Sequence, residues 1–233
     1  MKKIKAVFCW SGGKDSSLAL YQVLQENTYQ VVSLLTTLNA IHKRISMHGV
    51  REELLDMQAA SIGLPLEKVW VSEASNEEYE NNMELVLIGF KNEGVTHVIF
   101  GDIFLEDLRE YREQKLSAVG LTGVFPLWKQ DTRKLVSRFI TQGFKTLTCC
   151  ISTKWLDESF VGQEINQDFI SRLPAGVDPC GENGEFHSFC YDGPLFKQSI
   201  EFEKGDKVFR KMNSPDSENK SGFWFIDLLP ANK

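Results

Sequence analysis

The stretch Cys9-Trp10-Ser11-Gly12-Gly13-Lys14-Asp15-Ser16-Ser17 decides the fold of the first half of this chain. The apolar run Ile4 to Cys9, which leads into it, has the length and composition of a buried strand. Asp15 to Glu26 follows with apolar residues at helical spacing. A strand, a tight glycine turn and the first turn of a helix are therefore expected in direct succession.

This turn has the chemistry of an anion site. Adjacent glycines let backbone amides approach a bound phosphate closely, and the start of a helix adds unpaired N–H groups and a partial positive charge. Lys14 either supplies a cation or points to solvent. A carboxylate repels phosphates, so Asp15 is interpreted as the ligand of a bridging Mg²⁺ ion. The alternative is an ordinary strand-to-helix turn with a serine or aspartate cap. The predicted phosphate-binding residues are Ser11, Gly12, Gly13, Lys14, Asp15, Ser16 and Ser17.

Predicted strands and helices alternate through the rest of the first half. One helix opens at a capping box, Ser75 to Glu78, and ends at Gly94. Such alternation predicts an α/β fold with a parallel sheet covered on both faces. Ligands of such sheets bind at the carboxyl ends of the strands, where Gly101-Asp102 also falls. The predicted strands are 4–9, 31–37, 69–71 and 96–100, and the other helices are 15–26, 51–62 and 105–119.

The pattern changes after Trp128 and indicates a second, smaller α+β unit. We divide the chain into residues 1–128, a nucleotide-binding domain, and residues 129–233, a C-terminal substrate domain. No low-complexity linker separates them, so the two parts are expected to pack together. The second part is predicted to contain a helix at 132–142, strands at 146–151, 199–210 and 223–228, a turn-rich stretch at 174–194 and a polar loop at 213–221.

Composition excludes several classes of protein. With 42% hydrophobic residues among 233 and no apolar run of membrane-spanning length, the chain is expected to be cytoplasmic. The net charge of −6 argues against a large nucleic-acid footprint. Five cysteines without a C-x-x-C pair argue against a disulfide framework and a zinc ribbon. The roles of Cys180 and Cys190 stay open.

The loop Ser11-Gly12-Gly13-Lys14-Asp15-Ser16 resembles the signature of the N-type PP-loop ATP pyrophosphatases, which are adenine nucleotide alpha hydrolase-like proteins. It lacks the spacing of the loops in kinases and GTPases. The rest of the chain resembles one branch of this class, the diphthine–ammonia ligase family, nearly from end to end. The motifs that carry the resemblance are Met47-His48-Gly49, Gly101-Asp102-Ile103, Pro179-Cys180-Gly181-Glu182-Asn183-Gly184-Glu185-Phe186-His187 and Asp192-Gly193-Pro194-Leu195-Phe196.

This resemblance implies a Rossmann-like sheet of the PP-loop/HUP type followed by a smaller α+β domain. It also implies a reaction. ATP, with Mg²⁺, is cleaved to AMP and pyrophosphate, a carboxylate acceptor is adenylated, and ammonia displaces AMP to give an amide. The acceptor would be diphthine on elongation factor 2 in an archaeal or eukaryotic protein, and another carboxylate in a bacterial one. Free ammonia or a second protein would supply the nitrogen, and a homodimer is suggested by the family.

The same resemblance indicates the catalytic residues. Glu182 and Glu185 could order an ammonium ion and accept its proton, or bind Mg²⁺. His187 could act as an acid or base near neutral pH. Arg109 falls where the family has an arginine and could neutralise charge during adenylation. Lys14 and Asp15 complete the catalytic set, and His48, Gly101 and Asp102 are expected to contact the nucleotide.

Each assignment has a plainer alternative. The glutamates could lie in a solvated turn, His187 could be a packing residue, and Arg109 could pair with Glu106 or Glu113 on the helix surface. The stretch 104–111 and Leu116 depart from the family pattern in a region expected near the acceptor. Two other functions also remain open, a PP-loop enzyme that modifies transfer RNA and a non-catalytic sensor of ATP or AMP.

Overall fold

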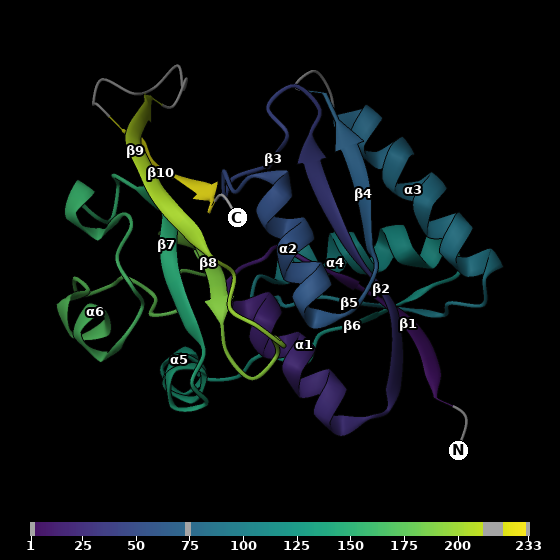
Figure 1. Cartoon of the computed structure of the whole chain (residues 1–233). Helices are drawn as coiled ribbons and strands as arrows, with labels where there is room; N and C mark the ends of the chain where they lie inside the picture. The colour runs from purple at the N-terminus through teal and green to yellow at the C-terminus, as the bar shows by residue number, and fades with distance from the viewer. Residues whose placement is uncertain (1–2, 73–75, 212–220, 232–233) are drawn as a thin grey trace.

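The computed structural model describes residues 3–72, 76–211 and 221–231. The first half of the chain, purple to teal in Figure 1, forms a six-stranded, mostly parallel sheet. In this sheet β2, β1, β5 and β6 are neighbours in that order. β4 pairs with β2 on its other side, and the short β3 pairs with the end of β2 in antiparallel fashion. The strands are β1 (Ile4–Cys9), β2 (Tyr29–Asn39), β3 (Arg44–Ile45), β4 (Leu66–Val71), β5 (His97–Ile99) and β6 (Thr122–Val124).

Helices cover both faces of this sheet, because successive residues of its central strand point to opposite sides. Phe8 of β1 belongs to the hydrophobic cluster that includes Leu20 and Leu54 of the helices on one face. Val7 belongs to a second cluster, with Leu87 and neighbouring residues of the helices on the other face. The helices of the first face are α1 (Lys14–Glu26) and α2 (Glu52–Ile62), and those of the second are α3 (Asn76–Asn92) and α4 (Glu106–Ala118).

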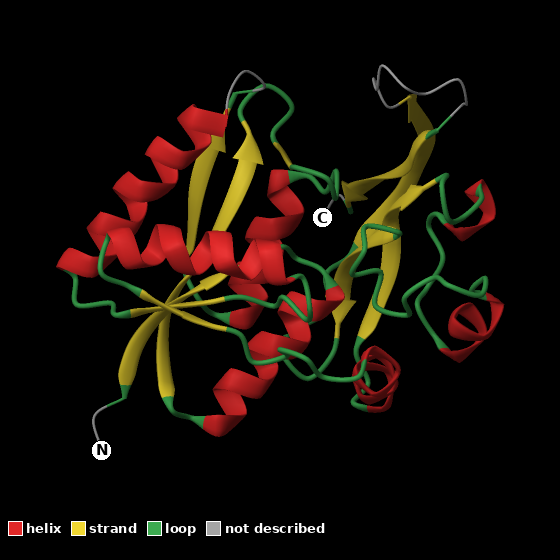
Figure 2. Cartoon of the chain, turned by 180° about the vertical axis from the view of Figure 1, so that it is seen from behind, coloured by secondary structure: helices red, strands yellow, loops and turns green. Residues whose placement is uncertain are grey.

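The C-terminal part forms a separate antiparallel sheet with the strand order β8-β7-β10-β9 (Figure 2). No helix in the described ranges is long and apolar enough to cross a membrane. The elements are α5 (Thr132–Thr141), β7 (Lys145–Ser152), the 3-10 helix η1 (Glu158–Phe160), α6 (Gln167–Arg172), β8 (Phe186–Asp192), β9 (Phe202–Lys211) and β10 (Gly222–Pro230).

This architecture confirms the predicted fold class, and it differs from the expected elements mainly in the second half. The stretch 174–194 was expected to be turn-rich, but its last part is strand β8, paired with β7. The short helix α6 was not expected either. Ser75 of the expected capping box and most of the expected loop 213–221 lie outside the described residues.

The two sheets are joined at the glycine turn after β1. The amide of Cys190 in β8 donates a hydrogen bond of 2.8 Å to the carbonyl of Gly12. Gln58 of α2, which is completely buried, donates to the carbonyls of Gly12 and Cys190 at 2.9 and 2.6 Å. Its own side-chain oxygen accepts from the indole N–H of Trp10 at 3.0 Å. One buried amide therefore ties together the turn, α2 and the second sheet.

A second connection is ionic. Asp227 of β10 accepts hydrogen bonds from Arg44 at 2.8 Å and from Arg51 at 2.8 and 3.0 Å. The sheets fall on either side of the predicted boundary near residue 129, but one hydrophobic cluster runs through both parts, from Phe8 to Phe189. The division into domains stays a prediction, and the two parts share a core.

We expect Gln58→Leu to lower the free energy of unfolding by about 2–4 kcal/mol, because it removes a hydrogen bond to each of the carbonyls of Gly12 and Cys190 and leaves the buried indole N–H of Trp10 without its partner. Urea unfolding followed by circular dichroism measures the effect. Gln25→Leu, at an exposed position of α1, is the matched control. Equal midpoints for the two variants would contradict the role given to Gln58.

Asp227→Asn should produce a pH-dependent loss of stability. The hydrogen bonds from Arg51, and then those from Arg44, hold the pKa of Asp227 well below its ordinary value. Such a carboxylate stabilises the fold above its unfolded pKa of about 4, and this contribution is lost as the pH falls through the folded pKa. Urea unfolding should give the wild type a free energy of unfolding about 1 kcal/mol higher than that of the variant near neutral pH, and this difference should shrink in acid. The exposed Asp206→Asn is the control, and an identical pH dependence for both variants would argue against the ion pair.

Candidate active site

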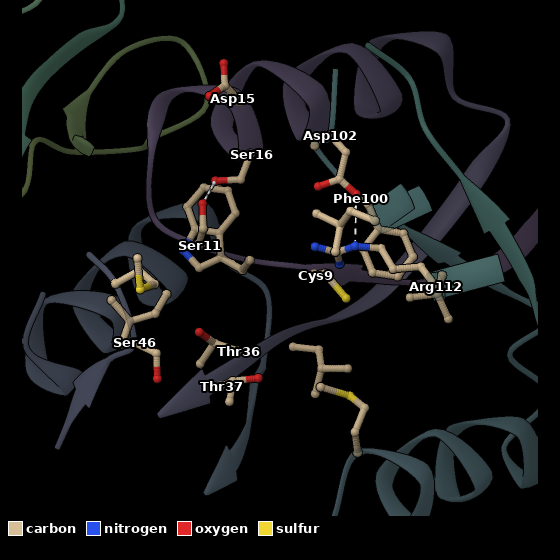
Figure 3. Close-up of a pocket in the computed structure, with 18 of the residues that line it drawn as sticks. Cys9, Ser11, Asp15, Ser16, Thr36, Thr37, Ser46, Phe100, Asp102 and Arg112 are labelled. Carbon is tan, nitrogen blue, oxygen red and sulfur yellow. Dashed lines mark hydrogen bonds and ion pairs between the residues drawn. The ribbon is translucent and has the colours of Figure 1, made fainter. Parts of the chain in front are cut away.

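A cavity of about 740 Å³ opens between the two halves of the molecule, at the carboxyl ends of β1 and β5 (Figure 3). These neighbouring strands lead to helices on opposite faces of the sheet, so the chain leaves a crevice between them, the usual ligand site of this topology. The glycine turn, the end of β2, α3, α4 and the start of β8 all contribute to the walls.

The glycine turn at the N-terminus of α1 has the form of an anion-binding loop, called the cradle below. Gly12 adopts a φ of +74°, which favours glycine. Within the described ranges, the amides of Asp15 and Ser16 donate no hydrogen bond, as expected at the start of a helix. The hydroxyl of Ser11 donates to that of Ser16 at 3.0 Å beside them. Ser11, Asp15 and Ser16 all line the cavity, so two free amides and two hydroxyls lie at one part of its wall, where phosphate oxygens can bind.

Two more glycines of this cradle leave little room for a side chain. A Cβ on Gly13 would come within 3.0 Å of the carbonyl oxygen of Ser188. A Cβ on Gly101, at the end of β5, would come within 3.0 Å of the amide nitrogen of Ser16. Gly12 and Ser17 do not line the cavity, and Ser17 instead donates to the carbonyl of Gly13 at 2.8 Å. Gly12 and Ser17 therefore support the conformation of the loop from the side that faces away from the cavity.

Lys14 does not point to solvent. Its side chain is 2% exposed and its Nζ lies 2.7 and 2.6 Å from the carboxylate oxygens of Asp15 and 2.5 Å from the carbonyl oxygen of Cys180. Burial lowers the pKa of Lys14, but its neighbours, Asp15 first and then Cys180 and Glu182, together raise the pKa above its ordinary value, so that the ammonium remains charged. The amide of Lys14 donates to the hydroxyl of Ser188 at 3.1 Å. This residue therefore links the cradle to the second sheet.

A Mg²⁺ site is not formed by protein side chains alone. Among the residues that the structure describes, no three His, Cys, Asp or Glu side chains gather as a metal would require. The carboxylate of Asp15 is already paired with Lys14. A magnesium ion would have to take most of its ligands from phosphate oxygens and water, which is its habit in nucleotide sites. The role of Asp15 as a metal ligand stays a prediction.

His48 and His187 lie against each other at the cavity wall, with ring centroids 4.6 Å apart. Nδ1 of His48 is 3.3 Å from the carbonyl oxygen of Ser188, and Nε2 of His187 is buried and has no hydrogen bond within the described chain. Burial lowers the pKa of His48 to about 3, and the neighbouring His187 lowers it further. Burial and then the charge of Lys14 lower the pKa of His187 to about 4. Both imidazoles are therefore neutral near pH 7.

The two glutamates of the C-terminal motif do not share a site. Glu182 lines the cavity, and its Oε1 accepts hydrogen bonds from the amides of Ile103 at 2.7 Å and Phe104 at 3.3 Å. Burial, and then the charge of Asp15, raises the pKa of Glu182 to about 7. Glu185 lies outside the cavity and is completely buried.

The carboxylate of Glu185 stabilises the loop in which it lies. It accepts hydrogen bonds from the amides of Asp178 and Asn183, both at 2.9 Å, and from the side-chain amide of Asn183 at 3.0 Å. A tight loop leaves its amides without strand partners, and a buried carboxylate satisfies several of them at once. The expectation that Glu182 and Glu185 point at one site is corrected in this way.

Arg109 does not line the cavity either. Its guanidinium stacks on Phe125 and Trp128, 4.9 and 4.6 Å from the ring centroids, and pairs with Glu113 at 2.7 Å, one turn along the helix. Arg112 reaches the cavity instead. Its Nε lies 3.0 Å from a carboxylate oxygen of Asp102, as Figure 3 shows.

Several residues of the cavity were given no role from the sequence. Leu108, Arg112 and Leu116 repeat at four-residue spacing, so an arginine within an apolar stripe was the available signal for Arg112. Thr36-Thr37, polar residues at the end of an apolar strand, was another signal, and the hydroxyl of Thr36 is buried without a hydrogen bond within the described part. The remaining lining residues stand in no sequence pattern that would mark them as part of a site. The further lining residues include Cys9, Ser46, Tyr79, Phe100, Cys180 and Ser188.

Comparison with known proteins agrees with the motifs that surround this cavity. The diphthamide synthase N-terminal domain matches residues 4–122, and the diphthamide synthase C-terminal domain matches residues 131–217. The diphthine–ammonia ligase of Danio rerio is 25% identical, over 91% of this chain and 91% of the relative. Those of Mus musculus and Homo sapiens are 24% and 23% identical, over 89% and 88% of this chain and 85% of each relative. The chain thus belongs to the diphthamide synthase family, which confirms the resemblance seen in its motifs.

Proposed function

We propose that this protein is an ATP-dependent ligase that converts a carboxylate into an amide. A carboxylate oxygen attacks the α-phosphorus of ATP, the bond between the α- and β-phosphates breaks, and pyrophosphate leaves. Ammonia then attacks the acyl carbon of the adenylate, AMP leaves with the electrons of the C–O bond, and the nitrogen loses a proton. The observation that carries this proposal is the phosphate cradle at α1, with the unpaired amides of Asp15 and Ser16, in a chain of this family.

The cradle is suited to the β- and γ-phosphates. Free amides at a helix start are hydrogen-bond donors that need no rearrangement to bind an anion. Lys14 keeps its charge through Asp15, so an ammonium lies at the cavity wall at any physiological pH. The adenosine would lie toward the end of β2, where Thr36 offers a buried hydroxyl without a hydrogen bond in the described chain. His48, next to Gly13, is a neutral contact on the same side.

Glu182 and His187 are the groups for the ammonia step. A carboxyl group with a pKa of about 7 takes up and releases a proton near neutral pH, as a base for an attacking ammonium must. His187 is neutral, so its free Nε2 can orient ammonia without repelling an ammonium ion. The relatives named diphthine–ammonia ligase supply the acceptor that we propose, diphthine, for a protein from an organism that makes it. Magnesium, a cytoplasmic location and a homodimer belong to the same proposal.

The first experiment identifies the products of ATP. Incubation of the protein with ATP, Mg²⁺, ammonium and candidate carboxylates should yield AMP and pyrophosphate, separated by ion-exchange chromatography. Asp15→Ala removes the partner of Lys14 at the cradle and should reduce the rate on the order of 100-fold. Asp168→Ala, on the exposed face of α6, should not. ADP and phosphate as products would refute the proposal, and ATP binding without any cleavage would favour a nucleotide sensor.

Glu182→Gln should change how stability varies with pH. A carboxyl group whose pKa is raised from about 4.3 to about 7 on folding favours the fold while protonated and loses this contribution as the pH rises between those values. The glutamine variant mimics the protonated form, so it should gain about 1–3 kcal/mol relative to the wild type between pH 5 and 8. Urea unfolding at each pH tests this, with the exposed Glu67→Gln as control. A pH-independent difference would rule out the near-neutral carboxyl group.

A further inference from the structure

The cavity extends beyond the phosphate cradle into a second arm between α3, α4 and the sheet. Its walls are mostly apolar, with Leu35 and Val98 from the sheet, Leu87 from α3, and Leu108 and Leu116 from α4. At the rim, Lys115 and Glu80 pair with each other at 2.7 Å. Arg112 reaches into this arm from α4, so a cation stands within apolar walls.

The guanidinium of Arg112 is held in place but only partly satisfied. It stacks on Phe100, 4.3 Å from the ring centroid, and its Nε lies 3.0 Å from Oδ2 of Asp102. Both of these atoms are buried, and neither makes a well-directed hydrogen bond within the described ranges. Burial raises the pKa of Asp102, and Arg112 counteracts this. The guanidinium therefore keeps N–H donors for a further acceptor.

This arginine lies close to the place where phosphates would bind. Asp102 follows Gly101, whose backbone packs against the first turn of α1, so closely that a Cβ would meet Ser16. In Figure 3, Asp102 and Arg112 stand on one side of the cavity, with Ser11 and Ser16 beside them. A group bound by Arg112 would therefore lie near the part of the cradle that Ser16 forms.

The environment of Arg112 suits one kind of charge. Asp102 already balances part of the guanidinium charge, and apolar walls penalise a polyanion such as a triphosphate. A single carboxylate matches the planar donor edge of an arginine and can take two parallel hydrogen bonds. We propose that this arm is the acceptor subsite of the ligase and that Arg112 anchors the carboxylate of an acceptor with an apolar body. This inference rests on the proposed function and names its substrate class.

The test compares hexanoate with hexanamide, which have the same shape and differ in charge. NMR titration of the whole protein, saturated with α,β-methylene ATP so that no cleavage occurs, measures both affinities. We expect hexanoate to bind at least about tenfold more tightly than hexanamide. Arg112→Gln should weaken hexanoate about 10-fold to 100-fold and leave hexanamide unchanged, the cost of losing a charge-assisted pair.

Controls separate anchoring from folding. Arg172→Gln removes an arginine that also stacks on a ring, Phe160, and pairs with Asp168, but lies away from the cavity, so it should leave hexanoate affinity unchanged. Arg112→Gln leaves the buried carboxylate of Asp102 without its cation. Arg112→Lys and the double variant Arg112→Gln/Asp102→Asn are therefore measured as well. The lysine should retain part of the affinity, and the double variant should lose it.

The proposal is overturned if hexanoate and hexanamide bind the wild type equally, or if neither binds. It is also overturned if Arg112→Gln weakens α,β-methylene ATP and leaves hexanoate unaffected, which would make Arg112 a nucleotide contact. The products of ATP in the wild type are measured separately. Failure of the ligase reaction would appear there, as ADP or as intact ATP, whatever the two probes do.

Discussion

The site depends on the buried amide of Gln58, which holds the carbonyls of Gly12 and Cys190 together with the indole of Trp10. A glycine turn at a strand end can adopt many conformations, and a phosphate cradle needs one of them. Here the turn is held from behind by α2 and β8, so that its free amides face the cavity. The cost of burying so many polar groups is offset because each has a partner.

Burial also sets the charges inside the cavity. Lys14 stays cationic because Asp15 is paired with it, whereas burial keeps the imidazoles of His48 and His187 neutral. The pKa of Glu182 is raised to about 7, so this carboxyl group exchanges its proton near neutral pH. The ammonium of Lys14, two neutral imidazoles and the exchangeable proton of Glu182 thus coexist in a small volume, a separation of roles that is usual in catalytic sites.

The sequence predicted the first half better than the second, for physical reasons. The strands β1, β2 and β5 are largely apolar runs, and this local signal survives without knowledge of the partner strands, whereas the short β3 and β6 carry no such run and were not expected. β8 mixes aromatic residues with His187 and Ser188, and becomes a strand only because β7 and the glycine turn supply partners for its backbone. The strand, glycine turn and helix start of the predicted phosphate loop were readable from neighbouring residues. Arg112 and the separation of Glu182 from Glu185 were not, because they depend on which face of a helix or loop turns inward.

The joint between Gly12 and Cys190 has a consequence for the way the protein is made. The glycine turn after β1 leaves the ribosome long before β8, the strand that completes it. Until β8 emerges, the carbonyl of Gly12 lacks the amide of Cys190, and the ammonium of Lys14 lacks the carbonyl of Cys180. Contacts between such distant segments form late and slowly. A nascent chain that has completed its parallel sheet therefore still has an unfinished glycine turn, and the turn gains its last partners only when β8 has been made.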